Sequence, residues 1–224
     1  MIAVVGVARA GLLVGGMAGL MLTPPFALSY FPAYGRSAGE RPPGWLDNLH
    51  EPLSDLGVFG TDWVATYTRY GKAYGVALLI ITASLAVVVN NRRHKGKWET
   101  RAWRTIVSGL ALVTVGTFGD YALPQDGWSN WGFGLELLGF LVIAVGTPLL
   151  SWALRREAKA SRFMAIGAGA VGPVSVVAGS GLVGHIPSGT ASLLLIAAIV
   201  IGITGLPDAT SISADAPDGA SAAA

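Results

Sequence analysis

Long apolar runs alternate with short polar segments along this chain. Each run is long enough to cross about 30 Å of hydrocarbon as a helix that rises 1.5 Å per residue. The runs occupy residues 1–30, 63–91, 97–121, 131–154, 163–183 and 190–206. The last is the shortest and crosses only with little tilt or with local thinning of the bilayer. The pattern predicts an all-α, polytopic membrane bundle of six transmembrane helices, which forms a single domain over residues 1–206.

Glycines and prolines in the first run predict how its helix packs and where it is interrupted. Gly11, Gly15 and Gly19 recur every four residues, so they share one face along which another helix can approach closely. Pro24 and Pro25 follow. Because proline lacks the N–H and clashes with the preceding turn, we expect this pair to end or kink the first helix.

Residues 31–62 form the one long polar connection between the predicted spans. Within it, apolar residues recur at near-helical spacing at Trp45, Leu49, Leu53 and Leu56. This spacing is typical of a short helix lying in the membrane interface, which Pro52 is expected to divide in two. We expect this segment to cover the extracytoplasmic face. Residues 207–224 are small, polar and acidic, and predict a disordered cytoplasmic tail.

The composition agrees with a protein whose solvent is lipid. Of its 224 residues, 52% are hydrophobic and 12% are charged, and the mean hydropathy is +0.57, whereas roughly a quarter of residues are charged in soluble domains. The chain has no cysteine, which excludes disulfides, thiolate metal sites and iron–sulfur clusters. Its net charge of +2 does not indicate a nucleic-acid partner, because the basic residues form short runs between apolar segments.

The basic residues predict the orientation of the helices. They gather in the second-to-third and fourth-to-fifth connections, as Arg92, Arg93, Lys95, Lys97, Arg101, Arg104, Arg155, Arg156, Lys159 and Arg162. By the positive-inside rule, both termini are then cytoplasmic. The tryptophans agree with this orientation as two interfacial belts, Trp98, Trp103 and Trp152 inside and Trp45, Trp63, Trp128 and Trp131 outside. Eleven arginines against four lysines point to a bacterial genome, and hence to the bacterial cytoplasmic membrane.

Polar residues that orientation does not explain collect at the extracytoplasmic end. Glu136 lies about five residues, or roughly 7 Å, inside the fourth helix, and Asp120 closes the third. The second helix carries Arg69, Lys72 and a stripe of tyrosines that includes Tyr74, and His185 ends the fifth helix. Intramembrane charges usually face inward and are paired. We therefore expect Arg69, Lys72, Tyr74, Asp120, Glu136 and His185 to line one ligand-binding cavity with at least one opposite-charge pair.

Two structural explanations compete with this predicted site. Charged residues so close to the membrane surface also serve as anchors, and an ion pair there also serves only to fix helix packing. Tyrosines at this level are more commonly part of an aromatic belt.

Cofactor chemistry has little support in the sequence. A metal site would need His50, Glu51, Asp55, Asp120, Glu136 and His185 to converge, and the segment HEPLSD lacks the two-histidine spacing of the zinc-protease motif. Haem needs axial ligands within spans, whereas the three histidines lie in loops or at helix ends. No nucleophile elbow or phosphate-binding loop is present. We expect neither a metal nor another cofactor.

Two functions from different classes fit this pattern. The first is a non-enzymatic membrane protein, either a binder or transporter of a small molecule or lipid, or an accessory subunit of a membrane assembly. The alternative is an intramembrane enzyme acting on a lipid or isoprenoid, with Glu136 or Asp120 as the acid–base residue. The expected partners are membrane lipids, a small hydrophobic or amphipathic ligand and another membrane protein contacting the glycine-rich helices, and no nucleic acid.

Overall fold

The computed structural model describes residues 2–35, 39–92, 95–122, 129–156, 160 and 162–206. All regular structure within these ranges is helical. The helices are α1 Ile2–Ala33, α2 Gly44–Asp47, α3 His50–Asp55, α4 Trp63–Asn91, α5 Lys97–Tyr121, α6 Ser129–Arg156, α7 Arg162–Val183 and α8 Ile186–Thr204. Six of them, all but α2 and α3, are long and apolar enough to cross a membrane. The prediction of an all-α chain with six candidate spans is therefore confirmed.

The helix boundaries lie close to those predicted. The bounds of α5 are the predicted 97–121, and those of α6 and α7 differ from the predicted ones by at most two residues. The largest difference is at α8, which begins at Ile186 rather than at residue 190. Pro187 occupies the second position of this helix, where no backbone N–H is needed, so the helix can start before the apolar run. The predicted tail at 207–224 lies outside the described residues.

Helix α1 runs through its prolines. Pro24, Pro25 and Pro32 all lie inside the helix, so of the two expected outcomes, an end or a kink at Pro24 and Pro25, the end is wrong and the kink stays a prediction. Just beyond Pro25, Phe26 and Ala27 are fully buried against other helices. Burial of this segment offsets the hydrogen bonds that the prolines remove, as neighbouring helices commonly do in membrane bundles.

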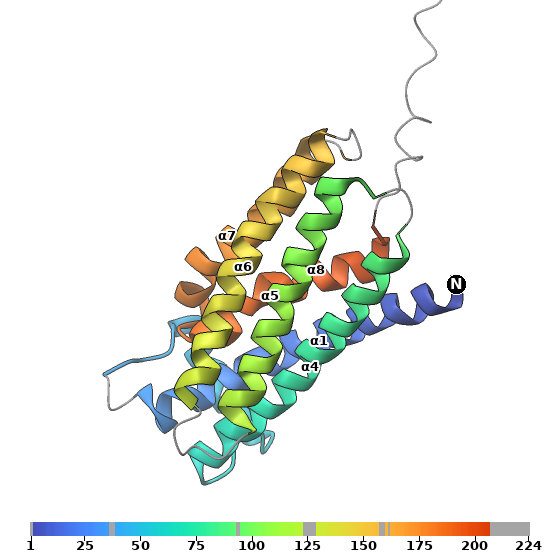
Figure 1. Cartoon of the computed structure of the whole chain (residues 1–224). Coiled ribbons are helices and arrows are strands. Elements are labelled where there is room, and N and C mark those ends of the chain that lie inside the picture. The colour runs from blue at the N-terminus through green and yellow to red at the C-terminus, as the bar shows by residue number, and fades with distance from the viewer. Residues whose placement is uncertain are drawn as a thin grey trace, which may run out of the picture.

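The six long helices form a closed ring. Each contacts the next in sequence, α1 with α4, α4 with α5 and so on to α8, and α8 returns to contact α1. In Figure 1, α5 and α6 run side by side at the front, and α1 and α8 pass behind them. We name the two ends of the bundle by the residues and helices that lie there. The basic end carries Arg101, Arg104, Arg155 and Arg156, and the loop end carries α2 and α3.

Glycines bring the backbones of neighbouring helices into contact. A Cβ on Gly116 of α5 would lie 2.6 Å from the carbonyl oxygen of Gly132 of α6. Helix α1 uses its glycines against two partners: Gly11 and Gly15 lie on α4, and Gly19 lies on Leu195 of α8. The predicted close approach at these glycines is confirmed, with the difference that two helices share the small-residue surface.

The long connection folds over the loop end. Its division into α2 and α3 falls at residues 48–49 and not at Pro52, which occupies the first turn of α3, where a proline is tolerated. The buried anchor of this segment is Leu46, which packs in one apolar cluster with Phe31 of α1 and Val183 of α7. Trp45, half exposed, donates from Nε1 to the carbonyl oxygen of Leu182 at 2.7 Å.

Candidate functional site

Four polar side chains from three helices and one turn form a buried chain of hydrogen bonds at the loop end. The hydroxyl oxygens of Tyr67 on α4 and Tyr121 on α5 are 2.8 Å apart. The Tyr67 hydroxyl also lies 3.0 Å from Nε2 of His185. Nδ1 of His185 in turn lies 2.8 Å from the hydroxyl oxygen of Ser188 in the first turn of α8. We call Tyr67, Tyr121, His185 and Ser188 the tyrosine–histidine network.

Phe26 of α1 fills the centre of this network. Its ring centroid lies 5.1 Å from that of Tyr67, 5.2 Å from that of Tyr121 and 4.8 Å from that of His185. Such aromatic pairs contribute about 0.5–1.5 kcal/mol each beyond the burial of their area. The network thus ties α1, α4, α5 and the start of α8 together.

The turn between α7 and α8 places His185 inside the protein. Gly184 has φ of 70°, which a residue with a side chain rarely adopts. His185 follows as the extended N-cap of α8, and the side chain of Ser188, three residues later, returns to it. Burial lowers the pKa of His185 to about 3. The imidazole is therefore neutral at physiological pH, with both ring nitrogens used inside the protein.

Glu136 of α6 is fully buried, and neither of its carboxyl oxygens has a hydrogen-bond partner among the described residues. The nearby hydroxyl of Thr117 donates instead to the carbonyl oxygen of Val113, at 2.9 Å. Close packing fixes the position of this acid, because Gly116 of α5 lies directly on its backbone. A buried polar group without a partner costs free energy, and a buried carboxylate costs far more.

The surroundings of Glu136 are tyrosines and a second acid. Its carboxyl interacts electrostatically with Tyr67, Tyr74 and Tyr121, and with Asp120 at the end of α5. Tyr74 is 1% exposed, and its hydroxyl lies 3.4 Å from the carbonyl oxygen of Ser188. Asp120 is only partly buried. Four of the six predicted site residues, Tyr74, Asp120, Glu136 and His185, therefore lie in or beside the tyrosine–histidine network.

The other two predicted site residues lie outside it. Arg69 and Lys72 are exposed on α4. The Arg69 guanidinium donates to the carbonyl oxygen of Val58 at 3.1 Å and lies 5.2 Å from the ring centroid of Tyr70. Over the described ranges, neither cation forms the expected pair with Asp120 or Glu136. The reason is rotational: two residues along a helix turn the side chain by about 200°, so Arg69 points away from the face that buries Tyr67.

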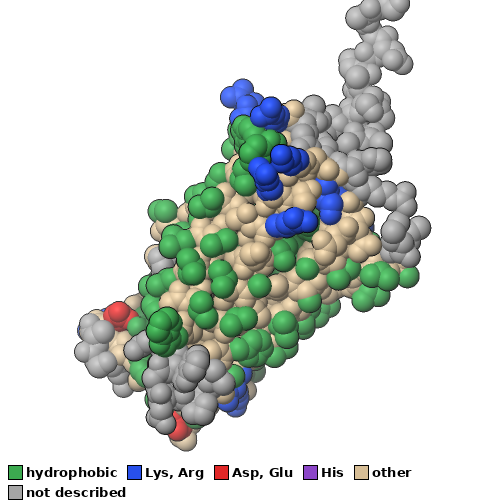
Figure 2. All heavy atoms as spheres, in the orientation of Figure 1, with side chains coloured by type: hydrophobic (Ala, Val, Ile, Leu, Met, Phe, Trp, Pro, Cys, Tyr) green, Lys and Arg blue, Asp and Glu red, His purple; other side chains and the backbone are tan. Residues whose placement is uncertain are grey.

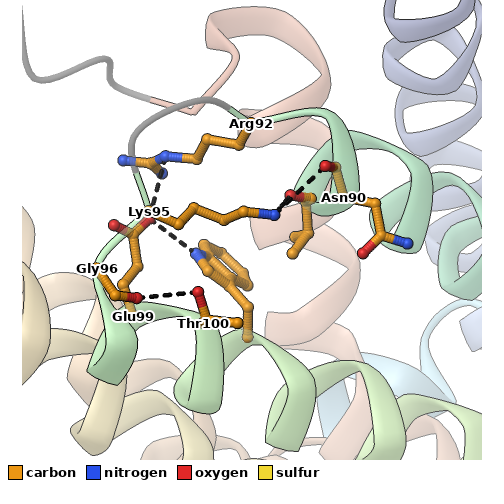
Figure 3. Close-up of polar contacts among 8 residues, drawn as sticks. Asn90, Arg92, Lys95, Gly96, Glu99 and Thr100 are labelled. Carbon is orange, nitrogen blue, oxygen red and sulfur yellow. Dashed lines mark hydrogen bonds and ion pairs between the residues drawn. The ribbon is translucent and has the colours of Figure 1, made fainter.

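A second buried glutamate, Glu99, forms an ion pair with a basic side chain. At the basic end, Oε1 of Glu99 lies 3.0 Å from Nε of Arg92 and accepts from Nε1 of Trp103 at 3.3 Å (Figure 3). Both charged side chains are almost fully buried. Trp103 is 4% exposed, so its expected place in the inner belt is wrong: its indole instead packs inside as a hydrogen-bond donor to Glu99.

Lys95 lies in the connection between α4 and α5 and contacts the end of α4. Its ammonium donates to the carbonyl oxygens of Val89 and Asn90 at the C-terminus of α4 (Figure 3). A cation at this position also meets the negative end of the helix dipole. Burial is the main cause that lowers the pKa of Lys95. The α4–α5 connection is therefore held by its own polar residues.

Sequence reasoning missed the central part of the site. It did not single out Phe26, Tyr121 or Ser188, and it gave more weight to a belt position for the tyrosines than to burial. One signal was present, since all six tyrosines of the chain fall toward one end of the predicted bundle. The buried Glu99–Arg92 pair was also missed, because in the sequence Arg92 is not distinguishable from the other basic residues of the same polar connection.

Comparison with protein-family models, curated proteins and solved structures gives no match. The class of the protein therefore rests on its fold, and the six long apolar helices indicate a membrane protein. Across the described ranges, no three His, Asp or Glu side chains converge where a metal ion could bind.

Proposed function

We propose that this is a multi-pass protein of the bacterial cytoplasmic membrane, with both termini cytoplasmic, that binds or transports a small cation at Glu136. The orientation is supported by the arginine-rich connections at the basic end. Glu136 and its tyrosine neighbours then lie toward the extracytoplasmic side. The observation that carries the proposal is the buried Glu136 carboxyl, whose two oxygens have no partner among the described residues.

The chemistry around Glu136 suits a cationic ligand. A carboxylate supplies charge and two acceptor oxygens. Tyr67, Tyr74 and Tyr121, which interact electrostatically with Glu136, are aromatic, and aromatic rings attract cations. The partly exposed Asp120, which interacts electrostatically with Glu136, adds a second acidic group. A small ammonium ion or an alkali cation matches this set of groups.

The positions of the protein's own basic residues favour an external cation at Glu136 over an ion pair within the protein. Arg69 and Lys72 lie on α4, which packs against α1 and α5, and both are exposed. The chain does bury an arginine beside Glu99, at the opposite end of the bundle. An intramembrane acid that is buried without a built-in partner most commonly marks a ligand, ion or proton pathway.

The test compares Glu136→Gln with Glu99→Gln, because both replace a fully buried glutamate by its isosteric amide. Purified protein in detergent is heated with chloride salts of sodium, potassium, ammonium, methylammonium or tetramethylammonium, with ionic strength held constant. At 100 times its Kd, a bound cation stabilises the fold by about 2.7 kcal/mol. We expect one of these cations to raise the Tm of the wild type and of Glu99→Gln, and not that of Glu136→Gln.

The stability of the two variants gives an independent readout. Glu99→Gln removes the carboxylate charge that lies 3.0 Å from Nε of the buried Arg92 and should cost about 3–5 kcal/mol. Glu136→Gln removes an unpaired acid and should leave the free energy of unfolding unchanged or raised. A folded Glu136→Gln protein that responds to every salt as the wild type does would refute cation binding at this residue. Uptake of the identified cation into proteoliposomes then separates a transporter from a binder.

A further inference from the structure

An open groove of about 610 Å³ lies between α6 and α7 at the basic end, far from Glu136. Helix α6 lines it with Pro148, Ser151 and Trp152, and α7 lines it with Ile166 and Gly169. Gly169 lets the helices touch, since a Cβ there would lie 2.6 Å from Cβ of Ser151. The groove therefore follows a line of direct contact between two helices that are otherwise exposed on this side.

The end of the groove is positively charged. Arg155 and Arg156, in the last turn of α6, complete its lining, and the described residues of that lining include no acidic side chain. Both arginines are exposed. The Arg156 guanidinium lies 5.2 Å from the ring centroid of Trp152, which holds it beside the groove. Guanidinium groups bind phosphate oxygens through two parallel hydrogen bonds, so two arginines in the lining of one groove favour a phosphate-bearing ligand.

The rest of the groove and its flank are apolar. Ile166 is 49% exposed, and Phe163 and Met164, one turn nearer the basic end, are 87% and 53% exposed. Trp152 makes an edge-to-face contact with Trp98 of α5, with ring centroids 5.2 Å apart, as expected of aromatic residues at a membrane interface. Figure 2 shows Lys and Arg side chains gathered at this end of the molecule, with hydrophobic side chains among and below them.

We propose that the α6–α7 groove binds one anionic phospholipid, with its headgroup phosphate between Arg155 and Arg156 and an acyl chain along Ile166. A free phosphate ion would use the two arginines but not the apolar part of the groove. The lipid uses both, and on the orientation proposed above the groove meets the anionic cytoplasmic leaflet. This inference concerns a defined binding groove and is independent of cation binding at Glu136.

The test is retention of lipid by purified full-length protein in mild detergent, measured by native mass spectrometry. Phosphatidylglycerol and phosphatidylcholine with identical acyl chains are compared. The double variant Arg155→Gln/Arg156→Gln removes both groove charges. Its matched control, Lys97→Gln/Arg104→Gln, removes two exposed charges from α5 at the same end but outside the groove. Ile166→Trp fills the apolar part and keeps every charge.

We expect the wild type and the control to retain phosphatidylglycerol over phosphatidylcholine. The groove double variant should lose about 25-fold in apparent affinity, at about fivefold for each arginine, and Ile166→Trp should lose binding with its charge intact. Equal losses in the groove and control variants would overturn the proposal, since they would indicate attraction to the whole basic end. Competition by millimolar inorganic phosphate as effective as that by phosphatidylglycerol would overturn it in favour of a free anion.

Discussion

The Tyr67 hydroxyl lies 3.0 Å from Nε2 of His185, although 118 residues separate the two in sequence. This contact joins the loop-end half of α4 to the turn before α8. Through Tyr121 and Ser188 it extends to α5 and into α8. Because Glu136 interacts electrostatically with Tyr67 and Tyr121, the network also sets the surroundings of the proposed cation site.

Tyr67→Phe should destabilise the protein by about 1–3 kcal/mol, because it leaves His185 and Tyr121 without the hydroxyl that joins them in a buried environment. The measurement is thermal or chemical unfolding in detergent micelles.

Tyr70→Phe is the matched control, one turn along the same helix. It removes a half-buried hydroxyl that donates to the carbonyl oxygen of Val58, and Arg69 still donates to that oxygen after the change. The control should therefore cost less than the Tyr67 variant. If both variants unfold at the same temperature, the network does not contribute to stability in the way described.

The stability of the protein should fall with pH because of His185. Its pKa is about 3 in the folded protein and about 6.5 when unfolded, so the unfolded chain binds the proton more readily between these values. The contribution is fully present above about pH 6.5 and is lost as pH falls toward 3, by no more than about 1.4 kcal/mol per pH unit. Unfolding of the wild type and of His185→Gln, which cannot titrate, is measured from pH 7.5 to 4.5.

The slope between pH 6.5 and 4.5 should be smaller in His185→Gln. Gly134→Ala is the control, because it leaves every titratable group in place and its new Cβ meets nothing within 4 Å. Its slope should match that of the wild type. An unchanged slope in His185→Gln would show that the imidazole is already protonated, or exposed, in the folded protein.

Gly116→Ala should separate α5 from α6. The new Cβ would lie 2.6 Å from the carbonyl oxygen of Gly132 and 2.7 Å from the amide nitrogen of Glu136, and backbone atoms cannot move aside individually. Overpacking of this kind costs about 1–3 kcal/mol. Gly134→Ala on α6 meets nothing within 4 Å and should be neutral or slightly stabilising. Unfolding of both variants in detergent checks the difference, and a Gly116→Ala protein as stable as Gly134→Ala contradicts the close backbone contact.

Part of the candidate site could be predicted because depth along a helix follows from residue number. The positions of Glu136, Asp120 and Tyr74 near one end of the bundle required only helix boundaries, and these were nearly correct. The ion pair expected with Arg69 or Lys72 failed, because pairing depends on which way each helix is rotated. A stripe of tyrosines near one end is compatible with either lipid contact or burial, and the choice depends on Phe26, a residue of another helix.

The sequence by itself determined the six long helices, their order and their approximate ends, since length and hydropathy are local properties of each segment. It also determined that one end would be rich in arginine. Only the tertiary structure decided that the helices close into a ring, that His185 meets Tyr67, and that Glu99 is paired whereas Glu136 has no partner among the described residues. These relationships depend on how helices distant in sequence are rotated and how closely they approach one another. The glycine contacts determine both, and they form only when the whole bundle is assembled.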